Sequence, residues 1–420
     1  MGTVIQHACS SWPDMAEPKS PCASPVRKPL FVRVPTCLSA SGVEDADPES
    51  PAGELLKNPH TGAAYSVEST LRDCRGGSVF LGRAVHAHAP RAELLVLKTV
   101  VAPARPSPSP APQSMDDGPP GEDSDSGENS DTGELAATDA NQRELLNEAR
   151  MLGYLKDMFE RRQRPRCFPA PVDYFHCAQS ARVCLAMEYV RGKDLFDFVK
   201  EQCGAPFDER QVAALAAPLL DGLAEMHALG VAHRDISCEN LLLLLDAQKR
   251  VQRLVLCDFG LSSFYTPPAP GLEPGLGLDA HFEENRAFFS VSPLTRQTAG
   301  KPGYCSPELL QGCANPFAAD VYALGVALFV MLTGRPPCAP TLCWKQLQRD
   351  RWFNVLWSGA WLSDPQMLAN ANARACYGHL SARALDVLDR IFKPERARPT
   401  VAELRQHPFF RVRRASAKGR

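Results

Sequence analysis

The chain has 420 residues, a formal net charge of −2 and a hydrophobic fraction of 44%. A net charge this close to zero gives no reason to expect nucleic acid or an anionic membrane as a partner. The longest apolar stretch, residues 321–332, is too short to span a bilayer and predicts a buried helix. Because the N-terminus also lacks the apolar stretch of a secretory signal, we expect an intracellular protein, in the cytoplasm or nucleus, with no membrane segment.

The 15 cysteines are odd in number, scattered, and form no Cys-x-x-Cys pair of the kind that binds zinc. Several lie inside apolar runs, such as Cys184 and Cys257, where a reduced cysteine behaves as a small hydrophobic residue. We therefore expect reduced structural thiols rather than a disulfide framework or a metal site.

The first part of the chain predicts a disordered leader followed by strands. Residues 1–60 carry Pro, Ser and short charges without sustained periodicity, which is typical of disorder. Residues 79–82 and 94–100 are apolar runs interrupted by turn-like residues, and they predict β-strands. Residues 101–138 then change to Pro-Ser alternation and an acidic run, so we expect a disordered insertion within a domain.

Helical periodicity becomes more frequent further along the chain. Residues 141–158 predict one main helix, and further strands are expected around 172–175 and 183–190. Beyond residue 207 the expected helices are 212–229, 321–332, 382–392 and 401–407. This order predicts an α+β fold with a small β-rich lobe over about 61–187 and a larger helical lobe over about 192–410.

The most informative motif lies near the middle of the chain. Asp235 is followed five residues later by Asn240, and Asp258 opens an Asp-Phe-Gly triplet 18 residues further on. A carboxylate, an amide and a second carboxylate in this order have the spacing of a phosphoryl-transfer site. The segment starts with His-Arg-Asp and resembles the catalytic segment of eukaryotic protein kinases of the Ser/Thr type. The resemblance implies a bilobal kinase fold, with Asp235 as the base that orients the acceptor hydroxyl and Asn240 and Asp258 as Mg²⁺ ligands.

The resemblance covers roughly residues 65–410 and implies ATP as a cofactor. Lys98 ends an alternating apolar strand, as does the lysine that contacts the nucleotide phosphates in the family. The family pairs this lysine with a glutamate on the next helix, and Glu148 is suitably placed on 141–158. Glu144 competes for this role and ranks lower, because it lies nearer the start of the helix.

The other nucleotide contacts are implied by the resemblance alone. The glycine-rich loop is depleted, because Arg72 and Cys74 stand where the family has glycines and only Gly77 is kept. This loss restricts the approach of backbone amides to phosphates. The Met-Glu-Tyr-Val run at 187–190 is similar to the hinge between the lobes. The implied nucleotide-binding residues are Gly77, Val79, Val96, Lys98, Met187, Glu188, Val190 and Leu242.

One residue of the catalytic segment departs from the usual pattern of the family. Ser237 stands two residues after Asp235, where Ser/Thr kinases usually carry a lysine aimed at the transferring phosphate. Lys301 in turn stands where the family usually has a threonine, and these two positions touch in the family fold. Our hypothesis is a swap, in which Lys301 is the catalytic cation and Ser237 takes the hydrogen-bonding role. Two independent losses would instead indicate a decayed enzyme.

Protein substrates are the partners that the resemblance implies. Asp194 and Glu239 lie where kinases that prefer basic substrates carry acidic residues, and would favour Arg upstream of the acceptor; solvated surface charge is the alternative. Residues 265–292 are rich in Pro and Gly near their start and predict a disordered insertion. An upstream activating kinase is a further expected partner, because Arg234 would bind a phosphate on one of several candidates, namely Ser290, Ser292, Thr295 and Thr298.

The C-terminal part carries residues that imply architecture. Glu308 ends a Ser-Pro-Glu segment similar to the Ala-Pro-Glu of the family, Arg398 matches its arginine partner, and Asp320 resembles the aspartate that opens the central helix. Residues 411–420 predict a flexible basic tail. Two alternatives stay open. A pseudokinase scaffold is supported by the depleted glycine loop and Ser237, and a small-molecule phosphotransferase fits poorly with a segment that shapes a peptide site.

Overall fold

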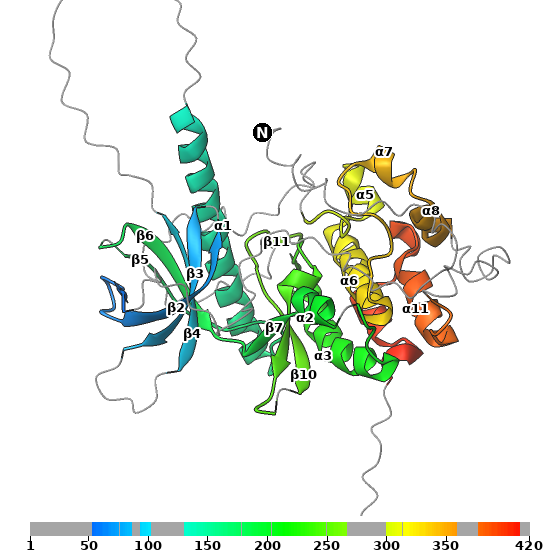
Figure 1. The fold of residues 1–420 in the computed structure, drawn as a ribbon, viewed down its shortest axis with the longest axis horizontal. Helices are drawn as coiled ribbons and strands as arrows, with labels where there is room; N and C mark the ends of the chain where they lie inside the picture. Colours follow the sequence, from blue (N-terminus) through cyan, green and yellow to red (C-terminus); the bar gives the residue numbers. More distant parts are fainter. Residues whose placement is uncertain are drawn as a thin grey trace, which may run out of the picture.

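Two lobes of different architecture lie side by side in the molecule (Figure 1). The computed structural model describes residues 53–85, 93–101, 130–266, 300–358 and 377–411, apart from Arg75, Ala178, Cys203, Lys249 and Cys313. The expected α+β fold is confirmed, because strands dominate the small lobe and helices dominate the large one. Most of each segment predicted to be disordered (1–60, 101–138, 265–292 and 411–420) lies outside the described residues.

The small lobe is built on one antiparallel sheet with the strand order β1-β2-β3-β4-β6-β5. Its strands are β1 (Leu55–Lys57), β2 (Ala64–Cys74), β3 (Gly77–Ala84), β4 (Leu94–Val101), β5 (Pro171–Cys177) and β6 (Arg182–Glu188). One long helix, α1 (Ser130–Arg161), packs against β4, β5 and β6. Because β4 lies between β3 and β6, Lys98 is held on both sides, opposite Val79 and Leu185.

Two boundaries in the small lobe differ from the prediction. Strand β1 lies inside the expected leader, because Leu56 is fully buried and pairs with Tyr65 of β2. Helix α1 begins at Ser130 rather than near residue 141, inside the expected insertion. Ala136, Ala137 and Leu135 favour helices, and the acidic residues Asp131 and Glu134 are favoured near a helix N-terminus. The sequence interpretation gave too much weight to repulsion between these charges.

The large lobe is mainly helical and begins after the connection from β6. Its longer helices are α3 (Glu209–Ala228), α6 (Pro316–Thr333) and α11 (Ala382–Ile391). The other elements are β7 (Gly192–Asp194), α2 (Leu195–Glu201), β8 (Val231–Ala232), η1 (Cys238–Asn240), β9 (Leu241–Leu245), β10 (Val251–Leu256), β11 (Ser263–Phe264), α5 (Pro307–Leu310), α7 (Trp344–Leu347), α8 (Arg351–Ser358), η4 (Glu395–Ala397), α12 (Val401–Arg405) and η5 (Pro408–Phe410).

Helix α6 forms the core of the large lobe, as the apolar run at 321–332 predicts. Asn315 caps its first turn by accepting a hydrogen bond from the Phe317 amide, and Pro316 stands at the first helical position. Gly334 ends the helix with a φ of 73°, a left-handed conformation that suits glycine. Among the described residues it is the one helix long and apolar enough to cross a membrane, and most of its residues are buried inside the protein.

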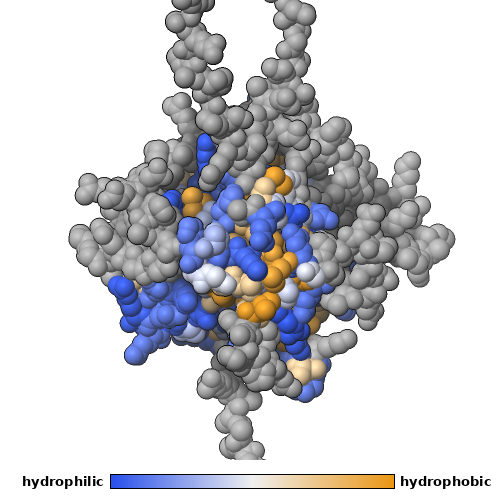
Figure 2. Space-filling model, turned by 90° about the vertical axis from the view of Figure 1, so that its left-hand side faces the viewer, coloured by the Kyte–Doolittle hydropathy of each residue, from blue (hydrophilic) through white to orange (hydrophobic). Residues whose placement is uncertain are grey.

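Apolar side chains pack into several clusters, two of which include residues of both lobes. One of these two includes α3, α6 and α11, and one cluster of the small lobe fills the face of the sheet around Phe80 and Phe175. Figure 2 looks at the small-lobe end, where hydrophobic residues lie between hydrophilic ones. In the described part of the chain, the large apolar residues left exposed are Leu55, Val85, Val101 and Val172.

A buried ion pair ties the segment before α6 to the end of the chain. The side chain of Arg398 is fully buried, and its Nη2 lies 3.1 Å from Oε1 of Glu308. The same guanidinium also donates to the backbone oxygens of Ile391, Ala318 and Lys393, at 2.9 to 3.0 Å. The expected partnership of Glu308 with Arg398 is therefore confirmed.

We expect Arg398→Met to lower the free energy of unfolding by about 3–5 kcal/mol, because it removes the charge that pairs with Glu308 and leaves three backbone oxygens without the donor that Arg398 supplied. Arg390→Met is the matched control. Arg390 pairs with Asp386 at 3.2 Å, but both side chains are largely exposed, so the change should cost less than about 1 kcal/mol. Urea unfolding followed by circular dichroism measures both. Equal losses in the two variants would contradict the proposed weight of the buried pair.

Candidate active site

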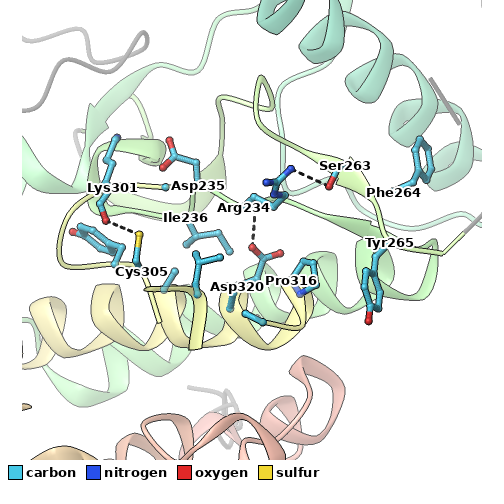
Figure 3. Close-up of a pocket in the computed structure, with 16 residues that line it drawn as sticks. Arg234, Asp235, Ile236, Ser263, Phe264, Tyr265, Lys301, Cys305, Pro316 and Asp320 are labelled. Atoms are coloured by element: carbon cyan, nitrogen blue, oxygen red, sulfur yellow. Dashed lines mark hydrogen bonds between the residues drawn. The ribbon is translucent and has the colours of Figure 1, made fainter. Parts of the chain in front are cut away.

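The loop between β8 and β9 is held in place by one carboxylate of α6. Asp320 accepts hydrogen bonds from the backbone amides of His233 and Arg234, both at 2.8 Å, and from Nε2 of His227 at 3.0 Å. Figure 3 shows the bond from Arg234 to Asp320. Arg234 has a φ of 70°, which is unfavourable for a residue with a side chain. The two amide bonds to Asp320 stabilise this conformation and so set the direction of the next residue, Asp235.

Asp235 presents one carboxylate oxygen that is free to accept a proton. Its Oδ2 accepts a hydrogen bond of 2.8 Å from Nδ2 of Asn240, which also donates to the Asp235 backbone oxygen. Within the described residues its buried Oδ1 has no hydrogen-bond partner. Burial raises the pKa of the Asp235 carboxyl to about 7, against the opposing charge of Lys301. The group is thus placed and tuned to receive a proton from a hydroxyl.

Asp258 lies directly after β10 and close to a lysine of the small lobe. Its φ of 68° is again left-handed, and its Oδ1 lies 3.1 Å from Nζ of Lys98. Burial alone would raise the pKa of this carboxyl, but the charges of Lys98 and Lys301 outweigh burial and the pKa is lowered. The carboxylate therefore stays ionised, as a cation ligand must be.

Lys98 joins the two lobes through Glu148 as well as Asp258. Its Nζ lies 2.6 Å from Oε2 of Glu148 on α1, and Oε1 of Glu148 accepts a hydrogen bond of 3.2 Å from the Phe259 amide. The expected choice of Glu148 over Glu144 as the partner of Lys98 is confirmed. Burial raises the pKa of Glu144, and the charge of Asp258 raises it further.

Asn147 is a positioning residue that sequence reasoning missed. Its side-chain amide donates to the backbone oxygens of Gly260 at 2.8 Å and Ser262 at 2.9 Å. These bonds fix the chain after the Asp-Phe-Gly triplet to α1. The position of Asn147 directly before Glu148 did not predict this role, because adjacent residues on a helix point in different directions.

Lys301 reaches into the same site from the segment before α5. Its Nζ donates to Oγ of Ser237 at 3.0 Å and to Oδ1 of Asn240 at 3.3 Å, and lies 4.0 Å from Oε2 of Glu239. In Figure 3 the Lys301 ammonium and the Asp235 carboxylate extend to the same side, away from Asp320. The expected contact between positions 237 and 301 is confirmed. The catalytic role of Lys301 stays a prediction.

An apolar cluster joins the expected adenine-binding residues. Val79 of β3, Val96 of β4, Met187 of β6 and Leu242 of β9 belong to one buried cluster, and Val190 packs against it. The sheet and the first strand pair of the large lobe thus contribute to one surface. Their contact with a nucleotide stays a prediction.

Glu188 and Gly77 are held by the small-lobe sheet. The side chain of Glu188 is exposed, and its backbone amide donates to the Ala170 oxygen at 2.8 Å. A Cβ at Gly77 would lie 2.0 Å from the Thr99 oxygen, so glycine is required here by strand packing. Strand packing alone therefore accounts for a glycine at position 77, so this glycine is not evidence for nucleotide binding.

The residues suit a hard divalent cation. An ionised carboxylate of Asp258 and the amide oxygen of Asn240 are the kind of oxygen ligands that Mg²⁺ prefers. Asn240 is fixed, because its Nδ2 is used twice on Asp235 and its Oδ1 stays directed toward Lys301. No group of three or more His, Cys, Asp or Glu suited to a metal occurs in the part of the chain that is described.

The two carboxylates expected to recognise basic substrates are buried. Asp194 is 1% exposed and caps α2 by accepting a hydrogen bond of 2.6 Å from the Asp197 amide. Glu239 is 5% exposed and faces Lys301. Neither presents a charge to solvent, so this structure gives no basis for the expected preference for upstream arginine. The candidate phosphorylation sites Ser290, Ser292, Thr295 and Thr298 lie outside the described residues.

Residues 170–410 match the family model described as the protein kinase domain. Because this match covers more than half of the chain, the chain belongs to the protein kinase family. The matched region begins near β5, so Lys98 and Glu148 lie before it. Their contacts with Asp258 and Phe259 tie that part of the small lobe to the matched region.

Several curated Ser/Thr protein kinases are similar to this chain. The mouse (Mus musculus) serine/threonine-protein kinase DCLK3 is 28% identical over 233 residues, which is 55% of this chain and 24% of that protein. The human (Homo sapiens) testis-specific serine/threonine-protein kinase 3 is 29% identical over 235 residues, which is 54% of this chain and 68% of that protein. The probable serine/threonine protein kinase IRE4 of Arabidopsis thaliana is 28% identical, and the match spans 20% of that protein. The chain thus spans a quarter or less of the length of two of these relatives.

We expect Glu148→Gln to lower phosphoryl transfer at least about tenfold, because the neutral amide no longer holds the Lys98 ammonium by charge. Glu144→Gln removes a neighbouring carboxylate of the same helix, whose pKa is raised mainly by burial. It should stay within about threefold of the unmodified protein. Initial rates with labelled ATP and a protein substrate compare the two, and a larger loss in Glu144→Gln would reverse the assignment.

Proposed function

We propose that the chain is an active Ser/Thr protein kinase that transfers the γ-phosphate of Mg-ATP to protein hydroxyls. The observation that carries the proposal is the buried Oδ1 of Asp235, which has no hydrogen-bond partner in the described part of the chain, while Oδ2 is bound by Asn240, a proposed cation ligand. A scaffold without catalysis would not need a buried carboxylate with an unused acceptor, because such a group is costly to bury. The names of the relatives support the Ser/Thr class.

Each residue of the proposed site has a separate role in phosphoryl transfer. The acceptor hydroxyl donates its hydrogen bond to Asp235, its oxygen attacks the γ-phosphorus, and its proton passes to Asp235. The bond from the γ-phosphorus to the bridging oxygen breaks, and ADP leaves with the electron pair. Lys98 binds the α- and β-phosphates and is oriented by Glu148. Asn240 and Asp258 would hold Mg²⁺, which supplies positive charge against the phosphate oxygens when bound.

The apolar cluster with Val79, Val96, Met187 and Leu242 supports the proposed place of the adenine. The backbones of Glu188 and Val190 would bind its polar edge. Control by an upstream kinase acting through Arg234 and the expected location in cytoplasm or nucleus stay predictions.

We expect the purified protein to incorporate labelled phosphate from Mg-ATP into Ser- and Thr-containing substrates, with much weaker labelling of Tyr. Asp258→Asn should lower the rate at least about 100-fold, because it removes an ionised ligand of the cation. Phosphoamino-acid analysis of the labelled product measures both. Equal labelling by the unmodified protein and by Asp258→Asn would instead support the pseudokinase alternative.

A pair of matched peptides tests the substrate preference. We expect a peptide with arginines upstream of the acceptor and the same peptide with alanines there to react within about threefold, because the carboxylates of Asp194 and Glu239 are buried rather than on the surface. Values of kcat/KM for the two peptides decide this. A preference of more than about tenfold for the arginine peptide would restore the original prediction from Asp194 and Glu239.

A further inference from the structure

The Lys301 ammonium forms its hydrogen bonds with neutral groups, and the carboxylates of Asp235 and Asp258 act on it by charge without a direct contact. The side chain is 7% exposed, and its two hydrogen-bond acceptors, Ser237 Oγ and Asn240 Oδ1, are neutral. The nearest carboxylate is that of Glu239 at 4.0 Å, and Oε2 of Glu239 has no hydrogen-bond partner among the described residues. Burying an ammonium with so little direct pairing is costly. An anion bound beside Lys301 would offset that cost.

The position of Lys301 identifies the kind of anion. Its ammonium shares Asn240 with Asp235, because Asn240 binds Lys301 through Oδ1 and Asp235 through Nδ2. One amide group thus separates the cation from the base. A group that reacts at Asp235 Oδ1 therefore lies near the Lys301 ammonium. In phosphoryl transfer this group is a phosphoryl, whose equatorial oxygens carry charge in the transition state.

We propose that Lys301 is a catalytic residue whose ammonium contacts the transferring phosphoryl group, and that Ser237 is the residue that positions it. The proposal rests on the proposed kinase function and names the cation of that same site. A fixed cation at the place where charge is shared between oxygens stabilises the transition state more than the ground state.

The local structure explains how Ser237 can serve this purpose. Ser237 is fully buried at the start of η1, where serine usually caps the turn. Its side chain makes no capping hydrogen bond, and its Oγ instead accepts from Lys301. The Oγ of Ser237 therefore serves as an acceptor for the Lys301 ammonium and not as a helix cap.

The segment that carries Lys301 is also fixed to the catalytic loop. The Lys301 oxygen accepts hydrogen bonds from the Tyr304 amide at 3.1 Å and from Sγ of Cys305 at 3.4 Å. The Tyr304 hydroxyl accepts from the Cys238 amide at 3.2 Å. Gly300 has a φ of 107°, and a Cβ there would lie 3.1 Å from the Arg234 oxygen. The cation is therefore brought to the site by the segment before α5 rather than by the loop that carries Asp235.

The first test separates catalysis from structural support. We expect Lys301→Met to lower kcat about 100-fold or more, as loss of one transition-state contact does, with KM for ATP within about threefold. Binding of a fluorescent ATP analogue and the melting temperature should change little. Lys393→Met is the matched control. Lys393 pairs with Asp389 at 3.1 Å in the large lobe, so kcat should stay within about twofold.

The second test moves the cation between the two positions. Ser237→Lys combined with Lys301→Thr should recover at least a tenth of the unmodified kcat, because it returns an ammonium to the same neighbourhood. Ser237→Ala should lower kcat about tenfold through loss of one charge-assisted hydrogen bond, and Ser237→Thr, which keeps the hydroxyl, should recover most of that loss.

Three results of these tests can be told apart. Near-normal kcat in Lys301→Met overturns the proposal for Lys301 and leaves the kinase function intact. Parallel losses of kcat, nucleotide binding and melting temperature in Lys301→Met, with no recovery in the double variant, assign Lys301 a structural role and overturn the proposal too. If the unmodified protein is no more active than Asp258→Asn, the kinase function itself is wrong and this proposal is wrong with it.

Discussion

The Asp320 carboxylate is the contact on which the catalytic loop depends. It is buried in α6 and accepts from two consecutive backbone amides, at His233 and Arg234. Those bonds hold Arg234 in a left-handed conformation, and this sets the direction of Asp235. Helix α6 is rigid because almost every side chain along it is buried. The large lobe therefore fixes the base before any substrate arrives.

The small lobe contributes through a few polar contacts across the boundary between the lobes. Lys98 binds Glu148 and Asp258, and Asn147 binds the chain after Gly260. All of these atoms come from α1, β4 and the segment after β10. A shift of α1 would therefore disturb the nucleotide-binding lysine and the cation ligand at the same time. In this fold the geometry of the site is a property of both lobes.

Much of the site could be predicted because its signals are local. Asp235, Asn240 and Asp258 stand at the short spacing of the kinase catalytic segment, and the resemblance to the family pointed to Glu148 on a helix that periodicity predicted. The predicted pairs of Lys98 with Glu148 and of Lys301 with Ser237 are both in contact. Asp194 and Asn147 are residues whose roles local sequence signals did not predict. An acidic residue before a helix is equally consistent with a surface charge and an N-cap, and only the 1% exposure of Asp194 distinguishes them.

Periodicity was enough to predict the α+β class and the buried α6, and the resemblance of short motifs to those of protein kinases pointed to the candidate site residues, because both signals act over short stretches of chain. Other features emerge only when the lobes are packed. They include the burial of Asp194 and Glu239 and the contact that Lys301 makes with Asn240. Burial and hydrogen bonding between residues distant in sequence depend on how the elements pack, and local propensity holds no information about that packing.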